Sequence, residues 1–262
     1  MSRAKDLFEE AVKLVNQSII NVKPGLEISL LLRRGYFEQV VFMLWVATRV
    51  VLYDRYLPKR RLEIVQELLQ THPALSDATK RVFTRSEVEQ IISDCVEELA
   101  QKLSSLRQGT TAVRGKLFEH VLLYPLSCLL HGRQNAQGKI IEVNAKATKY
   151  HLDGQITLNG RQVLGLSIKG NIRERLAESV ERAQNARLAG DFQDVWHIFL
   201  TVGDEQDRAK LVEAAHEPGY RGERIYTWTV LVQDTLNACP SPCPSYRPLS
   251  ELPEDIKDFL TS

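Results

Sequence analysis

The chain has 262 residues, of which 44% are hydrophobic and 26% are charged, and its formal net charge is +1 at pH 7. This length can bury a sizeable core, and the composition is that of an ordinary soluble globular protein. The balanced charge excludes a general field that attracts polyanions, so a nucleic-acid surface would have to be local, built from clustered arginine and lysine.

Neither membrane insertion nor secretion is indicated. The longest apolar run, residues 40–53, is too short for a bilayer and carries Arg49, so we expect a buried helix there. The N-terminal sequence MSRAKDLFEE lacks the apolar stretch of a signal peptide, which predicts a cytoplasmic protein. Cys239 and Cys243, in CPSPC, resemble half a metal site without a second pair or a nearby histidine. We expect reduced thiols, with a disulfide or a metal as the alternative.

The first part of the chain shows helical periodicity and no strand-like alternation of any length. Helices are expected at residues 4–21, 26–33, from 37 toward 56, at 62–69 and at 88–106. Residues 107–116, RQGTTAVRGK, read as a loop whose amides, hydroxyls and basic side chains suit phosphate contacts, although a plain surface loop fits nearly as well. An apolar helix follows, and its Glu119 is either partly exposed or directed at a metal site.

After residue 138 the periodicity changes from helical to alternating. Antiparallel strands are expected at residues 139–147, 151–158 and 161–169. Asn159-Gly160 between the last two is a strong hairpin signal. The elements expected next are a helix at 172–188, a buried strand at 195–202, a helix at 204–215, a strand at 225–232 and a small helix at 252–260. The Pro-rich stretch CPSPCPSYRP is expected to leave the core.

Three side chains of the predicted hairpin suit phosphodiester hydrolysis. Asp153 lies in its first strand, while Ser167 and Lys169 alternate at the end of its second and therefore point to one face. An acid can hold a Mg²⁺ ion that polarises phosphate, and a lysine can assist the attacking water. Taken singly, an aspartate in a turn and an exposed lysine are common, so the hypothesis of a hydrolytic site depends on the three residues occurring together.

This joint pattern resembles the PD-(D/E)XK nuclease signature, and the order of elements from Glu119 to Val232 is similar to the core of that superfamily. Leu152 stands in place of the proline and Ser167 in place of the second acid. The serine form resembles the type II restriction endonucleases that cut at sites containing CC and GG. That subgroup recovers its missing acid from the following helix. The position of that helix acid in the subgroup corresponds most nearly to Arg182 in this sequence. We therefore assign the role of the second acid to Glu181, with Glu178 or neither residue as the alternatives.

In the same subgroup a basic-acidic-arginine triplet follows the serine-x-lysine strand end, and here it is Arg173-Glu174-Arg175. Arginine can donate two hydrogen bonds to guanine, and glutamate can accept one from cytosine, so the triplet could read adjacent C·G pairs in the major groove. The alternative is an ion-paired helix face exposed to solvent. Together with the strand motif, recognition of DNA is the favoured interpretation.

The resemblance implies an α/β (α+β) fold, a restriction-endonuclease-like core with a mixed central sheet flanked by helices, at residues 108–235. Residues 1–107 would be an all-helical region for dimerisation and DNA clamping, and residues 236–262 a Pro-rich tail with a short helix. It implies a Mg²⁺-dependent type II restriction endonuclease, a homodimer that cuts double-stranded DNA. Asp153 and Glu181 would hold metal, Lys169 would assist water and Glu119 would support the site. The alternatives are a repair or junction nuclease and a non-catalytic DNA-binding protein.

Overall fold

The structure is a computed structural model, and it describes residues 3–22, 24–52, 111–145, 150–170, 172, 175–200, 205–228, 232 and 245–261. The chain divides into two compact units, Met1–Val121 and Leu122–Ser262. Within the described residues, no helix is both long enough and apolar enough to cross a membrane. The helices expected at 62–69 and 88–106, and the cysteines at 95, 239 and 243, lie outside the described residues.

The first unit is helical wherever it is described. Its helices are α1 (Arg3–Val22), α2 (Ile28–Arg33), α3 (Phe37–Leu52) and the first part of α8 (Thr111–Leu130). Side chains at helical spacing on α1 and α3, among them Val15, Ile19, Val40 and Leu44, are completely buried. This burial explains the apolar periodicity of residues 4–52 and confirms the helices predicted there.

Helix α8 begins earlier than the sequence indicated. Residues 107–116 were expected to form a loop, but α8 already includes Thr111 and continues through Lys116. Gly115 lies inside this helix even though a glycine there costs about 1 kcal/mol relative to alanine. Burial of Leu117 and Val121 on the same helix offsets that cost. The predicted loop was therefore wrong from Thr111 onward.

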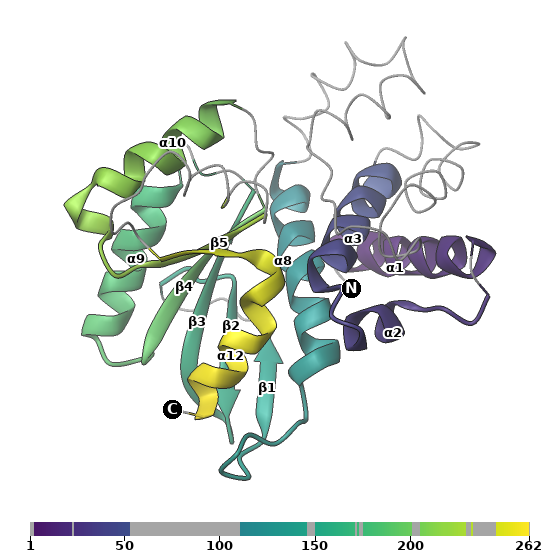
Figure 1. Ribbon diagram of the computed structural model, residues 1–262, viewed down its shortest axis with the longest axis horizontal. Helices are drawn as coiled ribbons and strands as arrows, with labels where there is room; N and C mark the ends of the chain where they lie inside the picture. The colour runs from purple at the N-terminus through teal and green to yellow at the C-terminus, as the bar shows by residue number, and fades with distance from the viewer. Residues whose placement is uncertain are drawn as a thin grey trace. The chain divides into compact units, whose positions relative to one another are not determined.

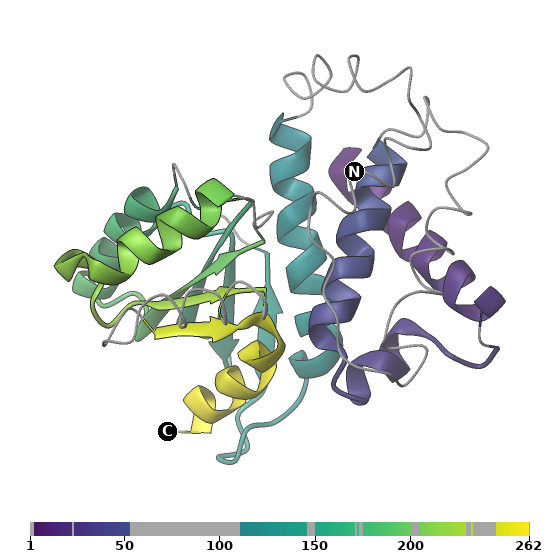
Figure 2. The same cartoon turned by 45° about the horizontal axis from the view of Figure 1, so that its top comes forward.

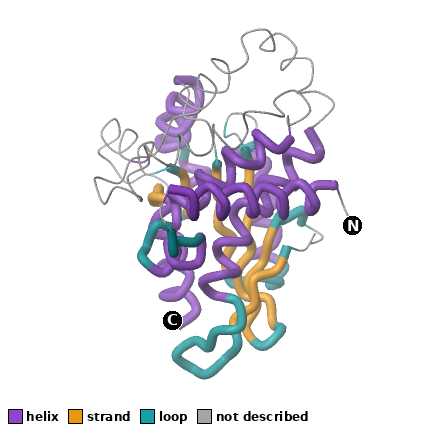
Figure 3. The backbone as a smooth tube through the Cα atoms, turned by 90° about the vertical axis from the view of Figure 1, so that its right-hand side faces the viewer, coloured by secondary structure: helices purple, strands orange, loops and turns teal. Residues whose placement is uncertain are grey.

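The second unit is built on one six-stranded sheet, whose strands are orange in Figure 3. The strands are β1 (Ile141–Asn144), β2 (Gly154–Leu158), β3 (Arg161–Lys169), β4 (Asp194–Phe199), β5 (Arg224–Thr227) and β6 (Ser245–Pro248). They are hydrogen-bonded in sequence order, antiparallel from β1 to β3 and parallel from β3 to β6. The mixed central sheet is thus confirmed (Figure 1).

The β2–β3 hairpin has the turn that its sequence predicted. Asn159 and Gly160 both have positive φ values, 49° and 77°. Two consecutive residues with positive φ are the mark of a type I′ turn, whose twist matches that of the flanking strands. The turn pairs Leu158 with Arg161, and a one-residue register shift between Ile156 and Thr157 then brings Gly154, at the start of β2, opposite Leu166 near the end of β3.

Helices cover both faces of the sheet, as Figures 1 and 2 show. Helices α9 (Leu176–Leu188) and α10 (Glu205–His216) lie on one face, where the Tyr246 hydroxyl donates to the Leu211 carbonyl at 2.7 Å. Helix α12 (Leu252–Thr261) lies on the other, where Phe259 contacts Trp196 with ring centroids 5.5 Å apart. Because both faces are covered, the central strands β3 and β4 are almost wholly buried.

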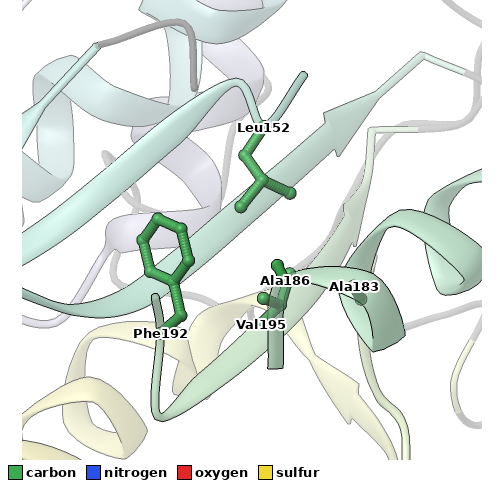
Figure 4. Packing of buried hydrophobic residues seen from close by; sticks show 5 residues of the cluster. All are labelled: Leu152, Ala183, Ala186, Phe192 and Val195. Atoms are coloured by element: carbon green, nitrogen blue, oxygen red, sulfur yellow. The ribbon is translucent and has the colours of Figure 1, made fainter. Parts of the chain in front are cut away.

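The packing between α9 and the sheet depends on small residues. Ala183 and Ala186 of the helix pack with Leu152, Phe192 and Val195 in one buried cluster (Figure 4). Alanine has a short side chain, so the helix backbone approaches the strands closely. The second half of α9 is thereby held against the start of β4.

The end of the chain belongs to the sheet. The Pro-rich stretch was expected to leave the core, yet Ser245–Pro248 forms β6, which pairs in parallel with β5. Pro248 is tolerated because β6 is an edge strand, where a missing N–H need not break the ladder. Buried Tyr246 and the following α12 tie this segment to the second unit.

Candidate active site

Asp153 and Lys169 form an ion pair where β2 begins and β3 ends. The Lys169 Nζ lies 2.7 Å from Asp153 Oδ2, and the backbone N–H of Ile168 donates to the same oxygen at 2.8 Å. Each side chain of the pair is only 16% exposed. Partial burial strengthens their attraction relative to a pair at the open surface, so the two groups hold each other in a defined geometry.

The geometry of the pair follows from strand register. The N–H of Asp153 donates to the carbonyl of Leu166 at 2.9 Å, which continues the β2–β3 ladder by one residue. Asp153 itself immediately precedes β2 rather than lying within it. The hydrogen bonds from Lys169 and Ile168 both fall on Oδ2, so Oδ1 is the oxygen that can be directed to a further ligand.

Ser167 lies on the same side of β3 as Lys169 but is deeply buried, with 2% exposure. Its hydroxyl is hydrogen-bonded to that of Ser179 on α9 at 2.7 Å. Because Ser179 lies in the first turns of the helix, this contact fixes α9 to β3 two residues before Lys169. Ser167 therefore connects the strand end to the helix.

The two acids considered for the helix have different surroundings. Glu178 accepts hydrogen bonds from Arg175 and Arg182. The hydrogen bond from Arg175 lowers the pKa of Glu178, and the charges of Arg182, Arg175 and Lys169 lower it further. Glu178 thus lies within the electrostatic field of Lys169 and carries a negative charge at neutral pH. Glu181, one turn further along, is exposed.

The predicted base-reading triplet is described only at its last residue. Arg175 precedes α9, its side chain is 53% exposed, and its Nη1 donates to Glu178 at 2.8 Å. Arg173 and Glu174 lie outside the described residues. A surface ion pair of this kind is weak, and the predicted role of the triplet in reading DNA stays a prediction.

Glu119 is in the first unit, on α8. Its carboxylate accepts hydrogen bonds from Lys116 Nζ at 2.9 and 3.0 Å, an i,i+3 pair on the helix. Its predicted supporting role in the site stays a prediction.

A buried polar network next to Ser167 was not predicted from the sequence. Ser179 Oγ lies 2.7 Å from His197 Nδ1, and His197 Nε2 lies 3.0 Å from Glu223 Oε2. Glu223 also accepts a hydrogen bond from Arg187, which bonds to Asp194 at 3.0 Å. A histidine within the apolar run VWHIFL is the sequence signal that could have indicated it, because an imidazole in a buried strand needs partners.

Burial alone would raise the pKa of Glu223, but hydrogen bonds from His197 and Arg187 outweigh it, and the pKa is lowered. The carboxylate is therefore ionised inside the protein. A buried charge with these partners is costly to disturb, so the network holds β4, β5 and α9 in fixed positions.

No family model matches the sequence, and no curated protein matches it. Among solved structures, the chain is similar to the restriction endonuclease PspGI in its complex with substrate DNA. The TM-score is 0.52 and the sequence identity 17%, and the match covers 99% of this chain and 93% of the other. The fold is restriction-endonuclease-like. At this identity the likeness concerns the fold, in agreement with the mixed sheet and its flanking helices.

The donor atoms at the strand end suit a hard cation. Mg²⁺ is commonly bound by one or two protein carboxylates, with water and phosphate oxygens completing its shell. Among the residues that the structure describes, no three His, Cys, Asp or Glu side chains gather to hold a metal. The carboxylate of Asp153 is of the kind that Mg²⁺ prefers, and its predicted role as a metal ligand together with Glu181 stays a prediction.

Proposed function

We propose that this chain is a Mg²⁺-dependent type II restriction endonuclease, which hydrolyses double-stranded DNA at a short site containing CC/GG. The observation that carries the proposal is the Asp153–Lys169 pair, 2.7 Å apart at the strand end of a restriction-endonuclease-like fold. The similar structure is a DNA complex, which supports DNA as the ligand of this fold.

In this proposal each residue of the strand end has one task. Mg²⁺ held by Asp153 and an acid of α9 would supply Lewis acidity to the scissile phosphate. Lys169 has three N–H donors, and its bond to Asp153 uses one of them. The others can orient the attacking water and neutralise charge that develops on the phosphate oxygens. Water would lose a proton to solvent as it forms the new P–O bond, while the bond to one ester oxygen breaks and that oxygen takes up a proton.

The second metal ligand is Glu178 or Glu181. Arg175 and Arg182 lower the pKa of Glu178, and the charge of Lys169 lowers it slightly further, so Glu178 is ionised and available to a cation. Its neighbour Ser179 is also hydrogen-bonded to Ser167, which keeps this part of the helix beside β3. Glu181 is the acid nearest to the family position and is exposed. The two single variants decide between them.

Recognition of the site would come from Arg173, Glu174 and Arg175, which precede α9. Exposed Arg175 could donate to guanine O6 and N7 once DNA displaces its contact with Glu178. A symmetric site cut on both strands requires two active centres related by a two-fold axis, so we propose a homodimer.

The test is digestion of unmodified plasmid DNA with purified chain and Mg²⁺, followed by run-off sequencing of the products. Discrete fragments whose ends share a sequence containing CC/GG support the proposal, and EDTA should abolish them. Nicking that depends on DNA structure instead would indicate a repair or junction nuclease. Specific binding without cutting would indicate a non-catalytic DNA-binding protein.

A further inference from the structure

Four buried polar side chains form a continuous chain of contacts that begins at Ser167. The exposed fractions are 2% for Ser167, 0% for Ser179, 0% for His197 and 3% for Glu223. Ser179 Oγ lies 2.7 Å from both Ser167 Oγ and His197 Nδ1, and His197 Nε2 lies 3.0 Å from Glu223. Each contact joins different elements, since the residues belong to β3, α9, β4 and the segment before β5.

Strand register brings two members of this chain together. Ser167 and His197 are register partners in the parallel β3–β4 pair, so their side chains point to the same face of the sheet. Helix α9 covers that face, and Ser179 lies between the two side chains. A single hydroxyl of the helix thereby bridges two neighbouring strands.

The chemistry of the four groups restricts how the hydrogens are arranged. The Glu223 carboxylate can only accept, so His197 Nε2 must carry a proton. Arg187 donates to the same carboxylate, and this fixes the acceptor in place. With Nε2 occupied, Nδ1 of His197 has Ser179 as its partner, and loss of that partner would leave a fully buried ring nitrogen unsatisfied.

We infer that His197 is a positioning residue of the strand-end site, which acts through Ser179 to fix the Ser167 hydroxyl and the first turns of α9 beside Lys169. Glu178 immediately precedes Ser179, so the same contact sets where that carboxylate lies relative to Lys169. This inference goes beyond the proposed nuclease function, and it rests on that function only for its effect on cleavage.

The experiment compares Ser179→Ala with Ser18→Ala. Both serines are completely buried in helices, but Ser18 donates to the Leu14 carbonyl of its own helix. Cleavage constants are measured below the melting temperature of both variants, and imidazole nitrogen resonances are recorded by NMR, with His197→Gln used for assignment. Ser179→Ala should lower kcat by about 10- to 100-fold with little change in KM, because small misplacements at a reacting centre have effects of this size.

The NMR measurement is independent of activity. Ser179→Ala should shift the Nδ1 resonance of His197, Ser167→Ala should shift it less, and Ser18→Ala should leave it unchanged. An unchanged kcat in Ser179→Ala would overturn the inference. If the wild-type chain does not cut DNA, the proposed function fails instead. In that case the inference is tested by the Nδ1 resonance of His197 alone. A shift of this resonance in Ser179→Ala upholds the inference, and an unchanged resonance overturns it.

Discussion

Leu152 packs directly over Gly165, so that a methyl group added at Gly165 would lie 2.6 Å from Leu152 Cδ1 and 3.1 Å from Val195 Cγ2. Leu152 is 2% exposed and immediately precedes Asp153. The residue that stands in place of the proline of the nuclease signature is thus a core residue, and its packing fixes the backbone that carries the acid.

Gly165→Ala should therefore affect both stability and the site. Overpacking of this kind costs about 1–3 kcal/mol of the free energy of unfolding, and moving Leu152 would also displace Asp153. Gly115→Ala is the control, because nothing lies within 4 Å of a methyl group there among the described residues and alanine suits a helix better than glycine. Urea unfolding curves for both variants check this, and equal stability of the two would contradict the packing argument.

Glu178→Gln and Glu181→Gln test the second metal ligand. We expect Glu178→Gln to lower Mg²⁺-dependent cleavage by more than about 100-fold, since even partners of metal ligands contribute about 10- to 100-fold. Its pairs with Arg175 and Arg182 are partly exposed, so the melting temperature should change little. Cleavage is measured over a Mg²⁺ titration. The opposite ranking of the two variants would assign the ligand to Glu181.

Arg175→Ala tests base recognition. The variant should lose about 1–3 kcal/mol of discrimination at one C·G pair if Arg175 reads guanine. The measurement is binding, with Ca²⁺ in place of Mg²⁺, to the cognate site and to single-base variants of it. Equal weakening on every sequence would make Arg175 a phosphate contact. Arg173→Ala provides the parallel test for the first arginine of the triplet.

Glu223→Gln tests the buried charge through pH. The pKa of Glu223 is lowered from 4.5 in the folded protein, so its stabilising effect is complete above that value and is lost as the pH falls through the folded pKa. At pH 7 the variant should lose about 3 kcal/mol of stability, because Arg187 and His197 lose a charged partner. Denaturation at pH 7 and below pH 4.5 should show the difference narrowing in acid. A constant difference would contradict an ionised Glu223.

Local patterns predicted the hairpin and its acid–lysine pair correctly. Asn159-Gly160 fixes the turn through its backbone preferences alone, and the bounds predicted for the second strand, residues 161–169, are those of β3. The pairing register shifts by one residue between Ile156 and Thr157, a feature that the local pattern did not predict and on which the position of Asp153 beside Lys169 also depends.

Contacts between distant segments could not be predicted in this way. The Ser179–His197–Glu223 chain depends on parallel strand order, and no local spacing connects residues 179, 197 and 223. The sixth strand was missed because its Pro-rich sequence suits an edge strand only after β5 is in place. The early start of α8 likewise reflects burial of Leu117 and Val121 rather than local propensity.

Cleavage by Lys169→Ala tests the central claim most directly. Lys257→Ala is the control, because Lys257 is a surface lysine of the same unit that pairs with Glu254 in its own helix. Both proteins are incubated with cognate DNA and Mg²⁺, and binding is measured separately with Ca²⁺. The proposed mechanism predicts that Lys169→Ala binds the site specifically but no longer cuts it, while Lys257→Ala cuts normally. Retained cleavage by Lys169→Ala would contradict the assignment of this strand end as the active site.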